Sequence, residues 1–92
     1  MSEDLDLRLR ALANPTRRLF LNLCWDEPRA AGDLSSRVDL APASVSEHLK
    51  NLTQAGLLDV TRAGTWRFYR TNQAAVQKSV EELMEEFSRL QG

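Results

Sequence analysis

The chain has 92 residues, of which 42% are hydrophobic and 27% charged, and its formal net charge at pH 7 is −1. This length allows one domain, over residues 1–92, and this composition is typical of a globular protein and excludes a disordered one. The near-zero charge argues against a strongly basic nucleic-acid binder, and no apolar run is long enough to span a membrane.

The first residues and the cysteine content favour the cytoplasm. Residues 1–6 are acidic, whereas a signal peptide begins with basic residues and continues into an apolar segment. The single cysteine, Cys24, excludes an internal disulfide and fits a reducing compartment. We therefore expect a cytoplasmic protein with no membrane association.

Two helices are predicted in the first third of the chain. Leucines recur at helical spacing over residues 4–13, which indicates a helix with one apolar stripe. Asn14 is a good N-cap and Pro15 suits the first position of a second helix, which we expect to end between residues 25 and 28. The side chains of this helix that we expect to face inward are Leu19, Phe20, Leu23 and Cys24.

A third, short helix is predicted over residues 30–38, followed by a sharp turn. Asp39 tolerates the left-handed backbone conformation better than most residues, so we expect it to make the turn. Leu40 is expected to pack into the turn between the third and fourth helices. Pro42 then opens a fourth helix, which ends at a left-handed glycine, Gly56. The apolar positions expected to face the core in these two helices are Ala31, Leu34 and Val38, then Val45, Leu49 and Leu52. Two helices joined so closely form a helix-turn-helix.

From Leu57 the hydrophobic period changes from helical to two. Residues 58–61 and 66–69 alternate apolar and polar side chains around a tip at Ala63-Gly64, which predicts a β-hairpin. A hairpin that follows the second helix of a helix-turn-helix is a wing. The fold class is therefore mainly α with a two-stranded hairpin: a winged helix-turn-helix of about five helices.

The last segment, residues 73–90, repeats apolar side chains at steps of four and three, as in a coiled-coil seam. A domain of this length buries only about 60–65% of its unfolded surface, and small domains often gain the missing burial by oligomerising. We therefore expect a homodimer formed by the first and last helices. The predicted interface residues are Leu5, Leu9, Leu12, Val76, Val80, Leu83, Phe87 and Leu90.

Three blocks make the chain resemble the ArsR/SmtB family of bacterial repressors. They read LRALANPTRRLFL, LAPASVSEHLKNLTQAGLL and TRAGTWRFYRTN, in this order and at the spacing of that family. The resemblance implies a dimer with two recognition helices and two wings that face one operator in double-stranded DNA. Three positions depart from the family pattern: Asp39 stands where glycine is common, Ala41-Pro42 replace a serine cap and its neighbour, and Glu47 is acidic where a basic or polar residue is frequent.

The candidate DNA-binding residues lie on the fourth helix and the wing. The N-terminal, non-core side of a recognition helix reads bases, and here it offers Ala43, Ser44, Ser46 and Glu47, with Lys50 further along. The serines can bond bases or phosphates, whereas Glu47 can accept from a cytosine amino group and would repel a phosphate. Arg62 and Arg67 flank the wing tip, where they can reach phosphates or the minor groove. For His48 two interpretations remain open, a phosphate contact and a structural hydrogen bond.

The central part of the chain carries a local excess of cations. Its basic residues are Arg29, Arg37, Lys50, Arg62, Arg67 and Arg70, against Asp33, Asp39, Glu47 and Asp59. A DNA footprint depends on such a local patch and not on the net charge. Outside this part, the resemblance implies that Arg17 ties helices together. For Arg18, a surface charge and a phosphate contact are both open.

Neither an enzyme nor a metal sensor is expected. The chain has one histidine, one cysteine and no glycine-rich phosphate loop, and we expect Cys24 to be a buried, inert thiol. The resemblance places one thiolate metal site at positions that are Ala30 and Gly32 here, and another in the stretch 73–79, which holds no histidine or carboxylate. The glutamates at 81, 82, 85 and 86 are expected on a solvated face. No cofactor is expected.

The sequence therefore predicts a dimeric DNA-binding repressor that recognises an inverted-repeat operator. Two alternatives remain open. One is a winged-helix module that binds a protein and has lost DNA binding, which Glu47 and the acidic pI of 5.8 favour. The other is a DNA-binding regulator that responds to a small molecule at the dimer interface or to a partner protein.

Overall fold

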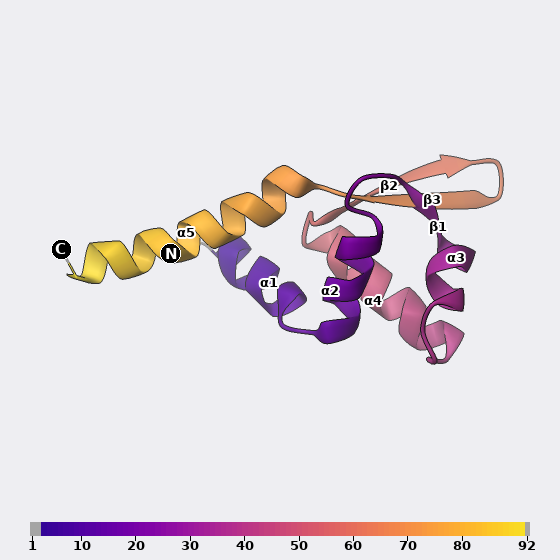
Figure 1. The fold of residues 1–92 in the computed structure, drawn as a ribbon, viewed down its shortest axis with the longest axis horizontal. Helices are drawn as coiled ribbons and strands as arrows, with labels where there is room; N and C mark the ends of the chain where they lie inside the picture. The colour runs from indigo at the N-terminus through magenta and orange to yellow at the C-terminus, as the bar shows by residue number, and fades with distance from the viewer. Residues whose placement is uncertain (1–2, 92) are drawn as a thin grey trace.

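The computed structural model describes residues 3–91 and shows the predicted winged helix-turn-helix. Its elements, in chain order, are α1 (Glu3–Leu12), α2 (Pro15–Leu23), β1 (Arg29–Ala30), α3 (Ala31–Ser36), α4 (Pro42–Gln54), β2 (Leu58–Ala63), β3 (Trp66–Thr71) and α5 (Gln73–Gln91). The molecule is elongated, with principal extents of 50 × 24 × 20 Å, because α5 and the β2-β3 hairpin extend toward opposite ends (Figure 1).

Helix α2 begins as the sequence predicts. Asn14 is its N-cap, with Oδ1 accepting from the backbone N–H of Arg17 at 3.0 Å, and Pro15 occupies the first turn. Phe20 and Cys24 are fully buried, as expected. Leu19, however, is exposed, and its place in the core is taken by Leu21. The buried face of α2 is centred on Phe20, and since α2 packs against α4 and β3, it turns Leu21 inward and Leu19 outward.

The turn between α3 and α4 corrects two expectations. No non-glycine residue of the described chain has a positive φ, so Asp39 does not adopt the left-handed conformation. Helix α3 ends at Ser36, which leaves residues 37–41 to make the turn without a left-handed residue. Leu40 is 40% exposed and does not pack into the turn between α3 and α4. Val38 packs against the core instead.

Helix α4 ends in a Schellman motif. Its core residues Val45, Leu49 and Leu52 are buried, as predicted. Gly56 has a φ of +77°, and the backbone N–H groups of Gly56 and Leu57 donate to the carbonyls of Thr53 and Leu52 at 3.0 Å. Leu57 and Leu58 then enter the core and start the hairpin.

The sheet has three antiparallel strands in the order β1-β3-β2. Ala63 pairs with Trp66, so the turn consists of Gly64 and Thr65, one residue later than expected, and Gly64 has a φ of +63°. Strand β1 was not predicted, because two residues are too few to show a period. Side chains alternate between the faces of the hairpin. We call the face that lies against α4, with Arg62, Arg67 and Tyr69, the inner face, and the other, with Asp59 and Arg70, the outer face.

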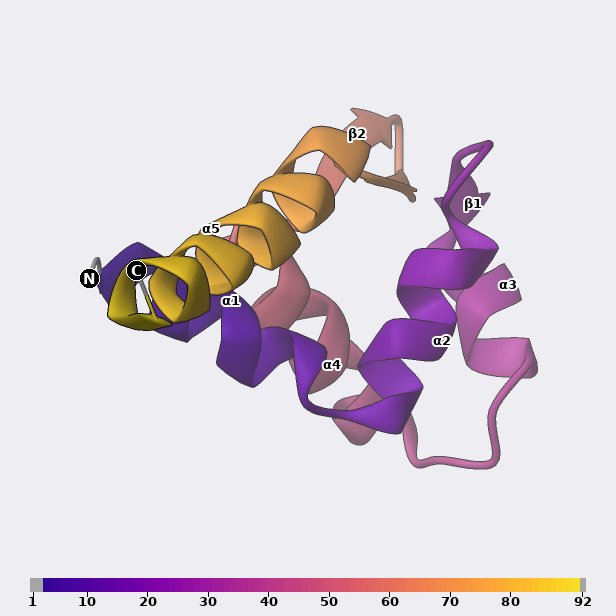
Figure 2. The same ribbon diagram turned by 60° about the vertical axis from the view of Figure 1, so that its left-hand side comes forward.

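Helix α1 lies beside α5 in both views (Figures 1 and 2). The buried Arg8 of α1 joins them: it donates to Ser79 Oγ at 3.0 Å and forms an ion pair with Glu82 at 3.1 Å. Glu82 therefore does not lie on a solvated face, and Glu86 is also half-buried, whereas Glu81 and Glu85 are exposed as expected. No helix within residues 3–91 is long and apolar enough to cross a membrane.

Candidate nucleic-acid interface

The exposed side of α4 contains the residues predicted to face DNA. Ala43, Ser44, Ser46, Glu47 and Lys50 are all exposed. Within the described part of the chain, the side chains of the polar members make no hydrogen bond or ion pair. Helix α4 is held by its opposite side, through Val45, Leu49 and Leu52, so this surface is available to a ligand.

His48 lies apart from this surface and is half-buried. Its Nδ1 is 3.3 Å from Nη1 of Arg17. Because a guanidinium can only donate, Nδ1 is the acceptor in this hydrogen bond. The structure thus favours a structural hydrogen bond over a phosphate contact.

Arg17 ties three segments together, as the family resemblance implied. Besides His48, it donates from Nε to the carbonyl of Ala11 at 2.8 Å and from Nη2 to that of Arg10 at 3.0 Å. These carbonyls belong to the last turn of α1. Arg17 therefore fixes the end of α1 against the recognition helix. Arg18 donates to the carbonyl of Leu12 at 2.8 Å and remains exposed.

A cleft of about 370 Å³ lies between α4 and the inner face of the hairpin. It brings together four predicted site residues, Ser46 and Lys50 of α4 with Arg62 and Arg67 of the wing. No acidic residue lines this cleft, and among residues 3–91 none of its three cations forms an ion pair. Unpaired cations on two sides of one cleft are arranged to hold an anion such as a DNA phosphate.

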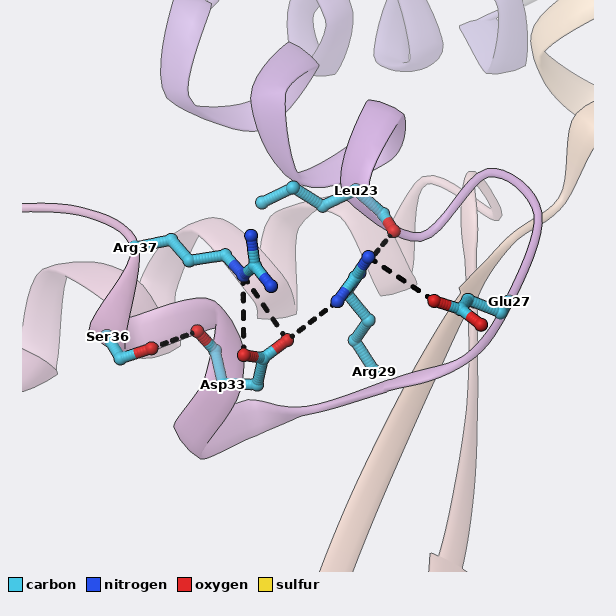
Figure 3. Close-up of polar contacts among 6 residues, drawn as sticks. All are labelled: Leu23, Glu27, Arg29, Asp33, Ser36 and Arg37. Atoms are coloured by element: carbon cyan, nitrogen blue, oxygen red, sulfur yellow. Dashed lines mark hydrogen bonds and ion pairs between the residues drawn. The ribbon is translucent and has the colours of Figure 1, made fainter.

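Arg29 and Arg37 do not contribute to this patch, because carboxylates neutralise them (Figure 3). Arg29 contacts Asp33 at 3.1 Å and Glu27 at 3.4 Å, and its Nε donates to the carbonyl of Leu23 at 2.6 Å. Arg37 contacts the other oxygen of Asp33 at 3.3 Å. The hydrogen bond from Arg29, together with Arg37, holds the pKa of Asp33 below its usual value. These side chains connect the end of α2 to α3, which is a structural role.

The predicted dimer interface is partly exposed in a single copy, most of all at Val80 and Phe87 of α5. Val80 and Phe87 are 55% and 50% exposed, and Met84, which the prediction omitted, is 59% exposed. We call these three side chains the α5 apolar face. Met84 follows Val80 by four residues, so helical spacing could have identified it. Leu83 and Leu9 are half-buried, and the side chain of Leu90 lies outside the described residues.

Two of the predicted α1 interface residues are used within the chain. Leu5 is 2% exposed in a single copy, so almost all of its surface is already covered within the chain. Leu12 packs against the core, as does Val76 of α5. On α1, Arg8 contacts α5 and Leu12 packs against the core, whereas Leu7 is 45% exposed.

Cys24 is fully buried at the end of α2. Burial raises the pKa of its thiol to about 11, so the thiol stays protonated at neutral pH. This agrees with the expectation of an inert thiol. Within residues 3–91, no group of three or more His, Cys, Asp or Glu side chains is placed to hold a metal ion.

Comparison with known proteins identifies the family. The family model for a helix-turn-helix domain matches residues 12–61, which is more than half of the chain. The transcriptional repressor SdpR of Bacillus subtilis is 32% identical over 71 residues, covering 77% of this chain and 79% of SdpR. The transcriptional activator HlyU of Vibrio cholerae is 32% identical over 73 residues, covering 79% of this chain and 68% of HlyU.

Solved structures agree with this. HlyU from Vibrio cholerae superimposes with a TM-score of 0.75 at 27% identity, covering 96% of this chain and 99% of the other. An ArsR family transcriptional regulator superimposes with a TM-score of 0.85 at 27% identity, covering 96% and 90%. The chain therefore belongs to the ArsR/SmtB family of winged helix-turn-helix proteins and is a DNA-binding transcriptional regulator, not an enzyme.

Proposed function

We propose that the protein is a cytoplasmic, homodimeric repressor that binds an inverted-repeat operator in double-stranded DNA. The observation that carries the proposal is the cleft between α4 and the wing, where Lys50, Arg62 and Arg67 lie beside the exposed side of the recognition helix and form no ion pair with any residue of 3–91. A phosphate backbone held in this cleft would bring the first turns of α4 to the base edges of the major groove.

The symmetry of the proposed dimer determines how the half-sites of the operator are arranged. Helix α5, which carries the α5 apolar face, extends away from the wing toward the other end of the molecule (Figure 1). Two copies joined through α5 would present two recognition helices related by a two-fold axis, which matches an inverted repeat whose half-sites are about one helical turn, or a multiple, apart. Occupying a promoter in this way would repress transcription, the role that the name of SdpR records.

Binding to the DNA upstream of the protein's own gene tests the proposal. Fluorescence anisotropy with a labelled fragment should show tight binding that weakens steeply between about 50 and 200 mM salt, because phosphate contacts release counterions. Footprinting should then protect two symmetric half-sites. Binding that does not depend on salt, or no binding to any promoter fragment, would favour a module that binds a protein partner.

We further propose that metal ions do not regulate DNA binding. The chain has two soft or borderline ligands: Cys24 is a buried thiol of raised pKa, and His48 uses Nδ1 in a hydrogen bond with Arg17. A tight zinc or arsenic site needs three or four converging, deprotonated ligands. Operator affinity should therefore be the same with zinc, cadmium, copper(II), arsenite or a chelator.

The control for this prediction is Cys24→Ser, which removes the thiol. A stoichiometric loss of affinity on adding a metal, in both the wild type and this variant, would show that a metal site exists elsewhere in the dimer.

A further inference from the structure

Glu47 is a free carboxylate on a surface that must approach a polyanion. It is exposed on α4 and makes no hydrogen bond or ion pair within residues 3–91. Asp33 and Glu82, in contrast, are neutralised, the first by two arginines and the second by Arg8. Glu47 is therefore available to a ligand, and its chemistry limits what that ligand can be.

The neighbours of Glu47 leave it room to reach a base. Ala43 and Lys50 stand four residues before and three residues after it, on the same side of α4. Ala43, Ser44 and Ser46 are short, so Glu47 extends beyond them toward the groove. Lys50 lines the cleft between α4 and the wing, where we propose that a backbone phosphate binds. Along the N-terminal half of α4, Glu47 is thus the long side chain that is free to contact base edges.

A carboxylate accepts hydrogen bonds and repels phosphates, so it needs a donor on a base edge. In the major groove the donors are the N4 amino group of cytosine and the N6 amino group of adenine. Adenine also presents the N7 acceptor beside its amino group, which would repel the second carboxylate oxygen. Cytosine presents no acceptor there, so it is the base that a glutamate selects.

We propose that Glu47 determines operator specificity by accepting a hydrogen bond from the amino group of one cytosine in each half-site. This inference rests on the proposed function, since it assumes that α4 enters the major groove. Guanine or thymine at that position would leave the carboxylate desolvated and unpaired, and adenine would place its N7 acceptor against the second carboxylate oxygen; both are costly. Discrimination against the other bases should be about 5- to 150-fold for each half-site.

Selection from randomised duplexes tests the proposal. The wild type should enrich sequences with an invariant cytosine in each half-site. Glu47→Ala should lose the preference at that position alone. Glu47→Gln should change it from cytosine to adenine, because an amide both donates and accepts and so matches N7 and N6 of adenine.

An atomic substitution in the DNA isolates the contact. Replacing that cytosine by a 2-pyrimidinone nucleotide removes the amino group and keeps the ring. The wild type should lose about 5- to 150-fold in affinity for each half-site, whereas Glu47→Ala should bind both duplexes equally. Asp59→Asn is the matched control: it removes an exposed carboxylate from the outer face of the hairpin and should leave base preference unchanged.

The outcomes separate this inference from the proposed function. If Glu47→Ala raises affinity for all sequences by one factor and keeps the same base preferences, the carboxylate only repels phosphates and the inference is wrong. The same holds if the wild type selects an operator without that cytosine, although DNA binding then stands. If wild type and variants select no DNA at all, the proposed function fails and this inference with it.

Discussion

Replacing Val80 and Phe87 by lysine is expected to give monomers that no longer bind the operator. Both side chains are about half exposed in a single copy and form the α5 apolar face with Met84. Burying an apolar side chain completely contributes about 1.5–3 kcal/mol, so the exposed half contributes about 1 kcal/mol. A symmetric interface loses four such side chains, and dimerisation should weaken at least roughly a hundred-fold.

Light scattering and analytical ultracentrifugation at micromolar concentration measure this change directly. The matched control is Glu81→Lys/Glu85→Lys, which makes a larger change of charge at exposed, polar positions of the same helix and should remain a dimer. A wild type that is monomeric at this concentration would show that the proposed assembly is wrong.

Side-chain contacts connect α5 to α1 and α1 to the recognition helix, so the way in which two copies associate would affect DNA binding. Arg8 joins α1 to α5 through Ser79 and Glu82. Arg17 then joins the end of α1 to His48 of α4. The two arginines therefore help to fix the orientation of the recognition helix relative to α5, and a dimer joined through α5 would hold its two recognition helices at a defined spacing.

Local signals in the sequence were sufficient for most of the secondary structure. Asn14-Pro15 and Gly56 begin and end helices through the groups that cap them, and Gly64 supplies the positive φ at the wing tip. These effects act over a few residues, so they can be read without knowing the fold. The conformation of Asp39 could not be predicted in this way, because it depends on where α3 ends. The same is true of the burial of Leu21 in place of Leu19, which depends on the elements that pack against α2.

The sequence was sufficient to select residues of the candidate site, but not to show which cations are neutralised by nearby carboxylates. Ser46, Lys50, Arg62 and Arg67 could be selected because recognition helix and wing were recognisable, and they meet at one cleft. The charge pattern alone also counted Arg29 and Arg37 as available cations. Their neutralisation by Asp33 and Glu27 depends on the geometry of the α2–α3 connection, which no spacing rule reveals.

Removing Arg62 and Arg67 together is expected to weaken binding to every DNA sequence. Both lie on the inner face of the hairpin, opposite each other in the register and beside Lys50 across the cleft. In a dimer the double alanine variant removes four phosphate contacts. At about 1 kcal/mol for each exposed contact, affinity should fall roughly a thousand-fold. The slope of log K against log salt concentration should become shallower by about 3 to 4.

Arg70→Ala provides the matched control, since Arg70 is an exposed arginine on the outer face of β3, the strand that also carries Arg67. It should keep the affinity and salt dependence of the wild type. The measurement is a series of anisotropy titrations with operator and with unrelated DNA, each at several salt concentrations. Arg62→Ala/Arg67→Ala should weaken binding to both DNAs by a similar factor, because phosphates carry no sequence information. An equal effect of Arg70→Ala, or a slope unchanged in the double variant, would mean that the inner face of the wing does not hold the DNA backbone.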